Sequence, residues 1–168
     1  MVSYGATVTR DRTEITNAIF LNMNPIFPNK RVILASGYFD PLHVGHIQYL
    51  KEAKQLGDIL IVIVNNDFQA ALKKGKAFMP ELDRWNIVSE LRCVDIPVLS
   101  VDSGPSVCET IEMLVQHGFN PMIFAKGGDR YSTEIPEKAT CDKYGIKIVD
   151  GLGAKIRSSS EFIQNANK

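Results

Sequence analysis

The stretch SGYFDPLHVGH, residues 36–46, follows the apolar run 32–35 and precedes a segment with helical patterning, residues 47–56. Two of the three histidines of the chain, His43 and His46, therefore lie where a strand passes into a helix. In a parallel α/β sheet this junction offers backbone N–H groups and the positive end of a helix dipole to an anion. The two imidazoles at this junction predict a phosphate site.

Apolar segments and helix-patterned segments alternate along the chain. The continuous aliphatic run at 59–64 is typical of a strand buried on both faces of a parallel sheet. Strands are expected at 32–35, 59–64, 96–101, 122–125 and 146–149, and helices at 45–56, 68–73, 81–92, 105–117, 134–144 and 158–165. Helices between successive strands imply right-handed crossovers. The alternation predicts an α/β fold, a single domain with a Rossmann-like parallel sheet and helices on both faces.

Proline and glycine positions refine these elements. Pro97 weakens its strand or places it at a sheet edge, because proline has no N–H to donate. Pro105 suits the first turn of a helix, and Gly118 and Gly145 suit helix ends. Residues 1–30 form an N-terminal extension whose apolar positions predict a short helix that docks on the sheet edge or on a neighbouring subunit. The domain itself is expected at residues 31–168.

The composition excludes several classes of function. Lys plus Arg equals Asp plus Glu at 19 each, so no overall charge attracts nucleic acid or an anionic membrane. The sequence lacks the basic stripe with interleaved aromatic residues that would indicate RNA binding. No apolar run reaches the length of a membrane span, and the N-terminus lacks the pattern of a signal peptide. An odd number of widely spaced cysteines, three in all, predicts a reduced, cytoplasmic protein.

The run that holds His43 and His46 resembles the HxGH signature of the cytidylyltransferase-like nucleotidyltransferases. Three later segments have counterparts in that family: ELDR at 81–84, KGGD at 126–129 and RSSS at 157–160. The resemblance covers roughly residues 31–165. It implies five parallel strands in the order 3-2-1-4-5, a homodimer or higher homo-oligomer, and transfer of a nucleotidyl group from an NTP, with Mg²⁺, to a small phosphorylated acceptor. Pyrophosphate is the second product.

The family resemblance assigns two roles to His43 and His46: binding the nucleotide phosphates and stabilising the pentacoordinate transition state. Their i, i+3 spacing puts both on one side of a helix start, and Gly45 leaves room for a phosphate beside the backbone. A zinc half-site is an alternative, but zinc needs more ligands than this pair provides. A hydrogen-bonded fold element is the other alternative. No protein-held metal is predicted.

Nucleotide-binding residues are expected at the ends of two strands and at the start of the last helix. The set is Gly37, Tyr38, Phe39, Asp40, Gly45, Lys126, Gly128, Asp129, Ser158, Ser159 and Ser160. Residues 38–40 form the wall beneath the nucleotide, and Asp40 either orients a group, assists Mg²⁺ or is an ordinary turn residue. Asp129 accepts from the ribose, the base or its own turn. The serines cap the last helix and, with exposed N–H groups, form a cradle for the β- and γ-phosphates.

Basic residues are expected to neutralise charge around the phosphates. Lys73 and Arg157 join the histidines in the predicted catalytic set. In the family a loop lysine neutralises the triphosphate or the acceptor phosphate, and here Lys73, Lys74 and Lys76 compete for that role. The predicted acceptor-binding residues are Lys74, Lys76, Arg84 and Arg130. The alternatives are a solvated lysine face and, for Arg84, a surface ion pair or a structural role.

The identity of the substrates stays open. The KGGD segment is similar to that of heptose-phosphate adenylyltransferases, whereas the length of the chain and its Leu42-His43 pair resemble glycerol-phosphate cytidylyltransferases. ATP and CTP are therefore both candidate donors, with a sugar phosphate or a polyol phosphate as acceptor. A catalytically silent nucleotide-binding or regulatory module of the same fold is the alternative from another class.

Overall fold

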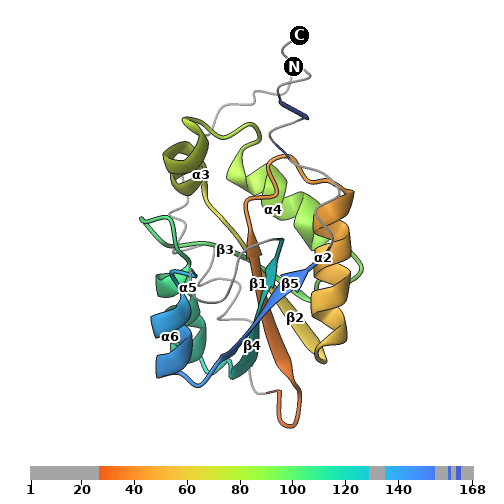
Figure 1. Cartoon of the computed structure of the whole chain (residues 1–168), viewed down its shortest axis with the longest axis vertical. Helices are drawn as coiled ribbons and strands as arrows, with labels where there is room; N and C mark the ends of the chain where they lie inside the picture. The colour runs from red at the N-terminus through yellow and green to blue at the C-terminus, as the bar shows by residue number, and fades with distance from the viewer. Residues whose placement is uncertain (1–26, 129–134, 154–158, 160–161, 164–168) are drawn as a thin grey trace, which may run out of the picture.

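The computed structural model describes residues 27–128, 135–153, 159 and 162–163. In these residues five strands form one sheet in the order β3-β2-β1-β4-β5 (Figure 1). The strands are β1 (Val32–Gly37), β2 (Ile59–Val64), β3 (Ile96–Leu99), β4 (Pro121–Gly127) and β5 (Lys147–Leu152). The helices are α2 (Val44–Gln55), α3 (Asp67–Lys74), α4 (Glu81–Ser89), α5 (Cys108–Gln116) and α6 (Lys138–Lys143).

Every strand pair in the sheet is parallel. β1 pairs with β2 in unbroken register from Val32 opposite Ile59 to Gly37 opposite Val64. The chain passes outward from β1 through β2 to β3 and then returns to β4 on the other side of β1, so the direction of winding reverses between β1 and β4. In open α/β sheets ligands bind beyond the carboxyl ends of the strands at such a reversal. The predicted fold class and strand order are confirmed.

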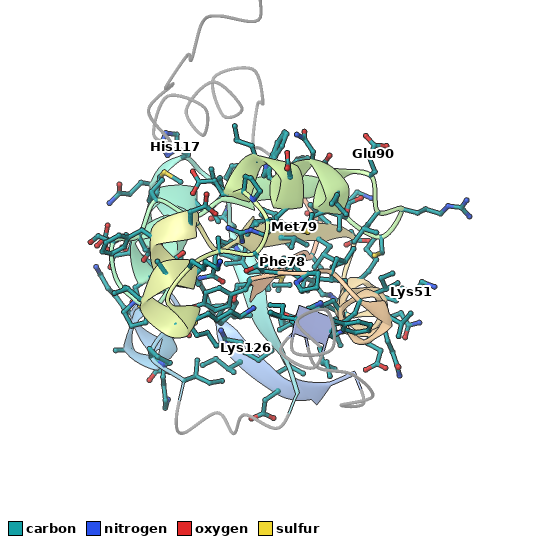
Figure 2. The ribbon with its side chains drawn as sticks, turned by 90° about the horizontal axis from the view of Figure 1, so that it is seen from above. Lys51, Phe78, Met79, Glu90, His117 and Lys126 are labelled. Atoms are coloured by element: carbon teal, nitrogen blue, oxygen red, sulfur yellow. The ribbon has the colours of Figure 1, made fainter. Side chains whose placement is uncertain are left out.

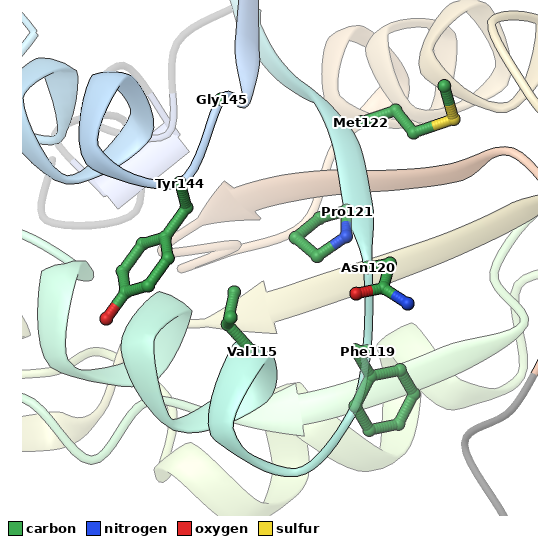
Figure 3. Close-up of a pocket in the computed structure, with 7 residues that line it drawn as sticks. All are labelled: Val115, Phe119, Asn120, Pro121, Met122, Tyr144 and Gly145. Carbon is green, nitrogen blue, oxygen red and sulfur yellow. The ribbon is translucent and has the colours of Figure 1, made fainter.

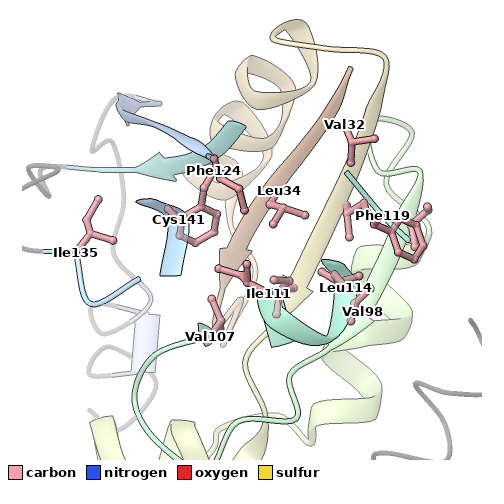
Figure 4. Close-up of a cluster of buried hydrophobic side chains, with 14 residues drawn as sticks. Val32, Leu34, Val98, Val107, Ile111, Leu114, Phe119, Phe124, Ile135 and Cys141 are labelled. Atoms are coloured by element: carbon pink, nitrogen blue, oxygen red, sulfur yellow. The ribbon is translucent and has the colours of Figure 1, made fainter. Parts of the chain in front are cut away.

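Two hydrophobic clusters cover the two faces of the sheet. Successive residues of a strand point to opposite faces, so Ile61 and Ile63 join one cluster while Leu60, Val62 and Val64 join the other. The first cluster packs against α5 and α6 through residues that include Ile111, Leu114 and Cys141 (Figure 4). The second cluster packs against α2 and α4 through Tyr49, Leu50, Ala53 and Val88.

Several predicted boundaries were wrong. The helix expected at 105–117 begins only at Cys108, because Gln69 Nε2 donates to the carbonyls of Gly104 and Ser106 and holds that segment as a loop. The strand expected at 96–101 ends at Leu99, and Asp102 beyond it accepts from the backbone N–H groups of Glu109 and Thr110. Asp102 therefore caps α5 from outside the helix.

Two other helices are shorter than the sequence indicated. α4 ends at Ser89 instead of residue 92, because the chain turns there through hydrogen bonds from Leu91 N to Val88 O and from Val94 N to Leu91 O. α6 begins at Lys138, and the preceding Glu137 is turned inward to accept from Val107 N. The edge position of β3, which contains Pro97, and the ends of α5 and α6 near Gly118 and Gly145 match the predictions. The helix expected within residues 1–30 lies outside the described residues.

Candidate active site

His43 and His46 lie at the start of α2, the helix that follows β1 in the chain (Figure 1). Their rings are stacked, with centroids 3.8 Å apart and planes 17° from parallel. The backbone N–H of His43 donates to Nδ1 of His46 at 3.3 Å. Because Nδ1 of His46 is an acceptor, we assign the proton of the neutral ring to Nε2. His46 therefore presents an N–H donor at the switch point of the sheet.

His46 remains uncharged at physiological pH. Burial lowers the pKa of His46 to about 3, and the nearby charges of His43, Lys74 and Lys73 contribute in the same direction. A neutral imidazole N–H donates a hydrogen bond without a protonation step, so it can stabilise negative charge that develops on a phosphoryl oxygen. The charges of His43, Lys73 and Lys74 thus all act on His46.

Phe39 supports His46 from the core. Its side chain is 1% exposed, its φ is +50°, and its ring meets the His46 ring edge-on with centroids 5.1 Å apart. A Cβ at Gly37 would lie 2.8 Å from the Phe39 ring, so any residue larger than glycine would displace that ring. The expectation that Phe39 lines the wall beneath the nucleotide is corrected, because the ring is buried under His46.

Asp40 fixes a loop instead of facing a ligand. Its side chain is fully buried and accepts from Phe78 N at 3.0 Å and from Met79 N at 2.8 Å. Lys74 Nζ donates to the carbonyl of Asp40 at 2.6 Å and lies 3.7 Å from its carboxylate. These contacts make Asp40 the anchor of the loop before α4. Partial burial lowers the pKa of Lys74, and Asp40 opposes that shift.

Arg84 also holds the site together from beneath. Its side chain is 1% exposed, and its guanidinium donates to the carbonyls of Met79, Tyr38 and Asn65 at 2.6–2.9 Å. It also forms a 2.7 Å ion pair with Asp67 at the start of α3. The expectation that Arg84 contacts the acceptor is corrected, because these bonds commit the guanidinium to joining the ends of β1 and β2 to α3 and α4.

The three loop lysines differ in their contacts and in their effect on His46. The Lys73 ammonium lies 4.4 Å from the centre of the Tyr38 ring, and both Lys73 and Lys74 lower the pKa of His46. Lys76 lies beyond the glycine that ends α3 and is exposed. Lys73 and Lys74 are therefore the lysines whose charge reaches the histidine pair.

Lys126 is positioned by residues that sequence reasoning missed. Its ammonium donates to Ser36 Oγ at 3.2 Å and lies 3.4 Å from the buried carboxylate of Glu137.

Tyr49 is another residue that sequence reasoning missed. It donates to the Ala125 carbonyl at 2.8 Å, which ties α2 to β4. The signal for Tyr49 was its position three residues after His46, on the same side of the helix. Figure 2 views this end of the molecule, with Lys126, Phe78 and Met79 labelled.

Two described residues near the end of the sequence, Ser159 and Phe162, lie close to the histidine turn. Ser159 Oγ donates to the Pro41 carbonyl at 3.1 Å, and the Phe162 ring lies 6.1 Å from the His43 ring with planes 23° apart. These contacts bring Ser159 and Phe162 to the histidine turn, while the predicted phosphate-binding role of Ser159 stays a prediction. The other predicted residues of the two late segments lie outside the described residues and stay predictions: Asp129, Arg130, Arg157, Ser158 and Ser160. Gly128, which is described, has a φ of +76°.

A cavity of about 230 Å³ lies elsewhere in the molecule (Figure 3). Its lining includes Pro121 at the start of β4 and Gly145 just before β5, so it lies at the amino ends of these strands. Ligand crevices of open α/β sheets lie at the opposite ends of the strands. The candidate active site is therefore the histidine pair and not this cavity.

The described residues offer no ready-made metal centre. Within those ranges no group of three or more His, Cys, Asp or Glu side chains is arranged to hold a metal ion. Across the same residues, no helix combines the length and apolar character needed to cross a bilayer.

Comparisons with known proteins agree with this geometry. A family model described as cytidylyltransferase-like matches residues 34–163. The bifunctional protein HldE of Citrifermentans bemidjiense is 37% identical over 146 residues, which cover 80% of this chain and 27% of that protein. HldE of Geotalea uraniireducens is 33% identical over 144 residues, which cover 78% of this chain and 28% of that protein. The chain thus spans about a quarter of the length of these curated relatives.

A solved structure leads to the same conclusion. The lipopolysaccharide core biosynthesis protein from Thermoplasma volcanium GSS1 is similar with a TM-score of 0.62 and 30% identity, over 75% of this chain and 99% of that chain. The residues matched by the family model include most of β1, the histidine turn and the last described residues. The chain therefore belongs to the cytidylyltransferase-like family.

Proposed function

We propose that this protein is a nucleotidyltransferase that moves the nucleotidyl group of ATP or CTP onto the phosphate of a small sugar phosphate or polyol phosphate. An oxygen of the acceptor phosphate attacks the α-phosphorus, the bond from that phosphorus to the bridging oxygen of the β-phosphate breaks, and pyrophosphate leaves. The observation that carries the proposal is the stacked His43–His46 pair at the start of α2, at the switch point of the sheet.

The protein contributes positioning and charge stabilisation. The Nε2–H of His46 and the first backbone N–H groups of α2 donate to the oxygens of the α-phosphate, on which charge accumulates during transfer. Lys73 and Lys74 add positive charge on the same side. No covalent intermediate with a side chain is required, because the acceptor attacks directly. When bound with the NTP, Mg²⁺ neutralises part of the phosphate charge.

The other predicted residues complete this arrangement. Arg157 and the serines 158–160 would hold the β- and γ-phosphates, and the bond from Ser159 to the Pro41 carbonyl supports this placement. Lys126, Gly128 and Asp129 would border the nucleoside, since β4 ends at the same edge of the sheet as β1. Lys76 and Arg130 would meet the acceptor phosphate.

The substrate class rests on resemblance. The KGGD segment is similar to that of heptose-phosphate adenylyltransferases, and the Thermoplasma volcanium relative is named for lipopolysaccharide core biosynthesis. Both support a sugar-phosphate acceptor. The cysteines Cys93, Cys108 and Cys141 are free thiols, which supports a reducing cytoplasmic setting. A homodimer is part of the proposal on family resemblance alone.

Pyrophosphate release tests the proposal. The protein is incubated with Mg²⁺, each of the four NTPs in turn, and pools of sugar phosphates or polyol phosphates. Release is expected with ATP or CTP and one pool, and it should vanish in the double variant His43→Ala/His46→Ala. His117→Ala is the matched control, because this third histidine lies at the far end of α5. Full activity in the double variant would overturn the assignment, and NTP binding without any turnover would favour a silent module.

A further inference from the structure

Four aromatic rings stand in series through the site. The Phe39 and His46 ring centres are 5.1 Å apart, those of His46 and His43 are 3.8 Å apart, and those of His43 and Phe162 are 6.1 Å apart. All three separations are in or near the range of favourable ring contacts. We call these four residues the ring column. The two histidines are its middle members, and each is in contact with a phenylalanine on its outer side.

The inner half of the ring column is fixed by the core. Phe39 is 1% exposed and lies beneath His46 with a T-shaped contact of 71° between the ring planes. The backbone N–H of His43 holds Nδ1 of His46 at 3.3 Å. One hydrogen bond and one buried ring therefore set the orientation of His46.

The outer half is built from the other end of the chain. The Phe162 ring lies beside the His43 ring, with centres 6.1 Å apart and planes 23° apart, although 45% of the residue is exposed. Ser159, three residues earlier in the sequence, donates to the carbonyl of Pro41, which lies two residues before His43. This bond fixes Ser159 close to the histidine turn. An exposed aromatic ring kept against a histidine in this way limits the rotation of the imidazole.

We propose that Phe162 is a positioning residue for His43, and that it completes the ring column so that both imidazoles are aligned before the nucleotide binds. This inference rests on the proposed function, because alignment matters only where the pair stabilises a transition state. Displacing a catalytic group by about 1 Å can lower the rate by up to about 100-fold. Phe162 touches neither substrate in this proposal and acts through His43.

The test compares substitutions of Phe162 in the full-length protein. Phe162→Leu keeps an apolar side chain but removes the ring, and it is expected to lower kcat about 10-fold while KM for the NTP changes less than about twofold. Phe162→Tyr keeps the ring and should restore kcat to within about twofold. Phe68→Leu is the matched control, because Phe68 is 49% exposed on α3 and lies outside the ring column. Its kinetic constants should equal those of the wild type.

Imidazole NMR spectra provide a readout that does not depend on turnover. Loss of the Phe162 ring should shift the His43 ring signals strongly and the His46 signals less, while those of His117 stay unchanged as an internal reference. Wild-type kcat in Phe162→Leu, or unchanged His43 signals, would overturn the inference. If the wild type has no transferase activity but the His43 signals shift as expected, the ring contact stands while its catalytic purpose fails together with the proposed function.

Discussion

The hydroxyl of Tyr49 donates to the carbonyl oxygen of Ala125 at 2.8 Å and accepts from the backbone N–H of Ser36 at 3.3 Å. One side chain of α2 thus joins the helix that carries the histidine pair to β1 and β4. Burial raises the pKa of Tyr49 well above its usual range, so the hydroxyl stays a donor at any physiological pH.

Removal of this hydroxyl should destabilise the protein. Tyr49→Phe leaves the buried carbonyl of Ala125 without this donor, and we expect the free energy of unfolding to fall by about 1–3 kcal/mol. Tyr144→Phe, at the surface end of α6, should change it by less than about 0.5 kcal/mol. Urea denaturation measures both values, and equal stabilities for the two variants would contradict the role of Tyr49.

A methyl group at Gly127 should also destabilise the protein, because it would collide with the Tyr49 ring. A Cβ there would lie 2.9 Å from the Tyr49 ring, so Gly127→Ala is expected to lower the free energy of unfolding by about 1–3 kcal/mol. Gly104→Ala is the control, since no atom lies within 4 Å of its added Cβ. The first glycine of the KGGD segment is therefore required by packing. Thermal or urea unfolding of the two alanine variants checks this, and similar values would refute it.

Arg84 should be among the most sensitive residues for stability. Arg84→Met removes a buried cation and leaves three carbonyl oxygens without their donor, so we expect a loss of about 3–5 kcal/mol. Arg84→Lys cannot reproduce the planar set of donors and should recover only part of that loss. Arg92→Met, an exposed arginine after α4, should be neutral within about 0.5 kcal/mol. A mild effect of Arg84→Met in denaturant titrations would mean that its hydrogen bonds are dispensable.

The folding stability should depend on pH through His46. Its pKa is about 3 in the folded protein against an ordinary value of 6.5, so between these values the unfolded chain binds a proton that the folded protein does not. Stability is therefore expected to fall as the pH drops from about 6.5 towards 3, with a slope of up to about 1.4 kcal/mol per pH unit from this group. His46→Gln lacks this contribution. Denaturation curves at several pH values should diverge between the two proteins, and parallel pH profiles would disprove the low pKa.

Lys73 should matter for turnover more than its exposure suggests. If the proposed function holds, Lys73→Met removes positive charge beside the histidine pair and should lower kcat/KM about 10-fold. Lys51→Met, on the exposed side of α2 (Figure 2), should have no effect. Steady-state pyrophosphate release measures both variants. Equal kcat/KM values would show that the Lys73 charge is too well solvated to act.

The amount that could be predicted from sequence differed between the fold and the site. The aliphatic run of β2 and the alternation of strands with helices predicted the fold class, because burial on both faces leaves a direct periodic signal. The strand order came from family resemblance and not from that signal. Helix starts were less predictable: Asp102 caps α5 from six residues before the helix begins, which no local pattern reveals.

The site was predictable in position but only partly in the roles of its residues. His43 and His46 lie together at the strand-to-helix junction that the motif indicated, whereas Asp40, Phe39 and Arg84 are buried and support that junction. The roles of His43, His46 and Lys73 toward a nucleotide stay predictions. A short motif cannot distinguish a side chain that meets a ligand from one that positions its neighbour, because both are close to the same turn. Glu137 and Tyr49 were missed because their partners are distant in sequence, at Lys126 and Ala125.

The bond from the His43 backbone to His46 Nδ1 has a consequence for the rate of the reaction. A donor that keeps one proton on Nε2 from weakly acidic to alkaline solution contributes no ionisation of its own to the pH–rate profile. An acid limb would then belong to a group other than His46, such as the acceptor phosphate, whose second ionisation lies near pH 6. If the acceptor phosphate sets that limb, acceptors with more acidic phosphates should remain reactive at lower pH.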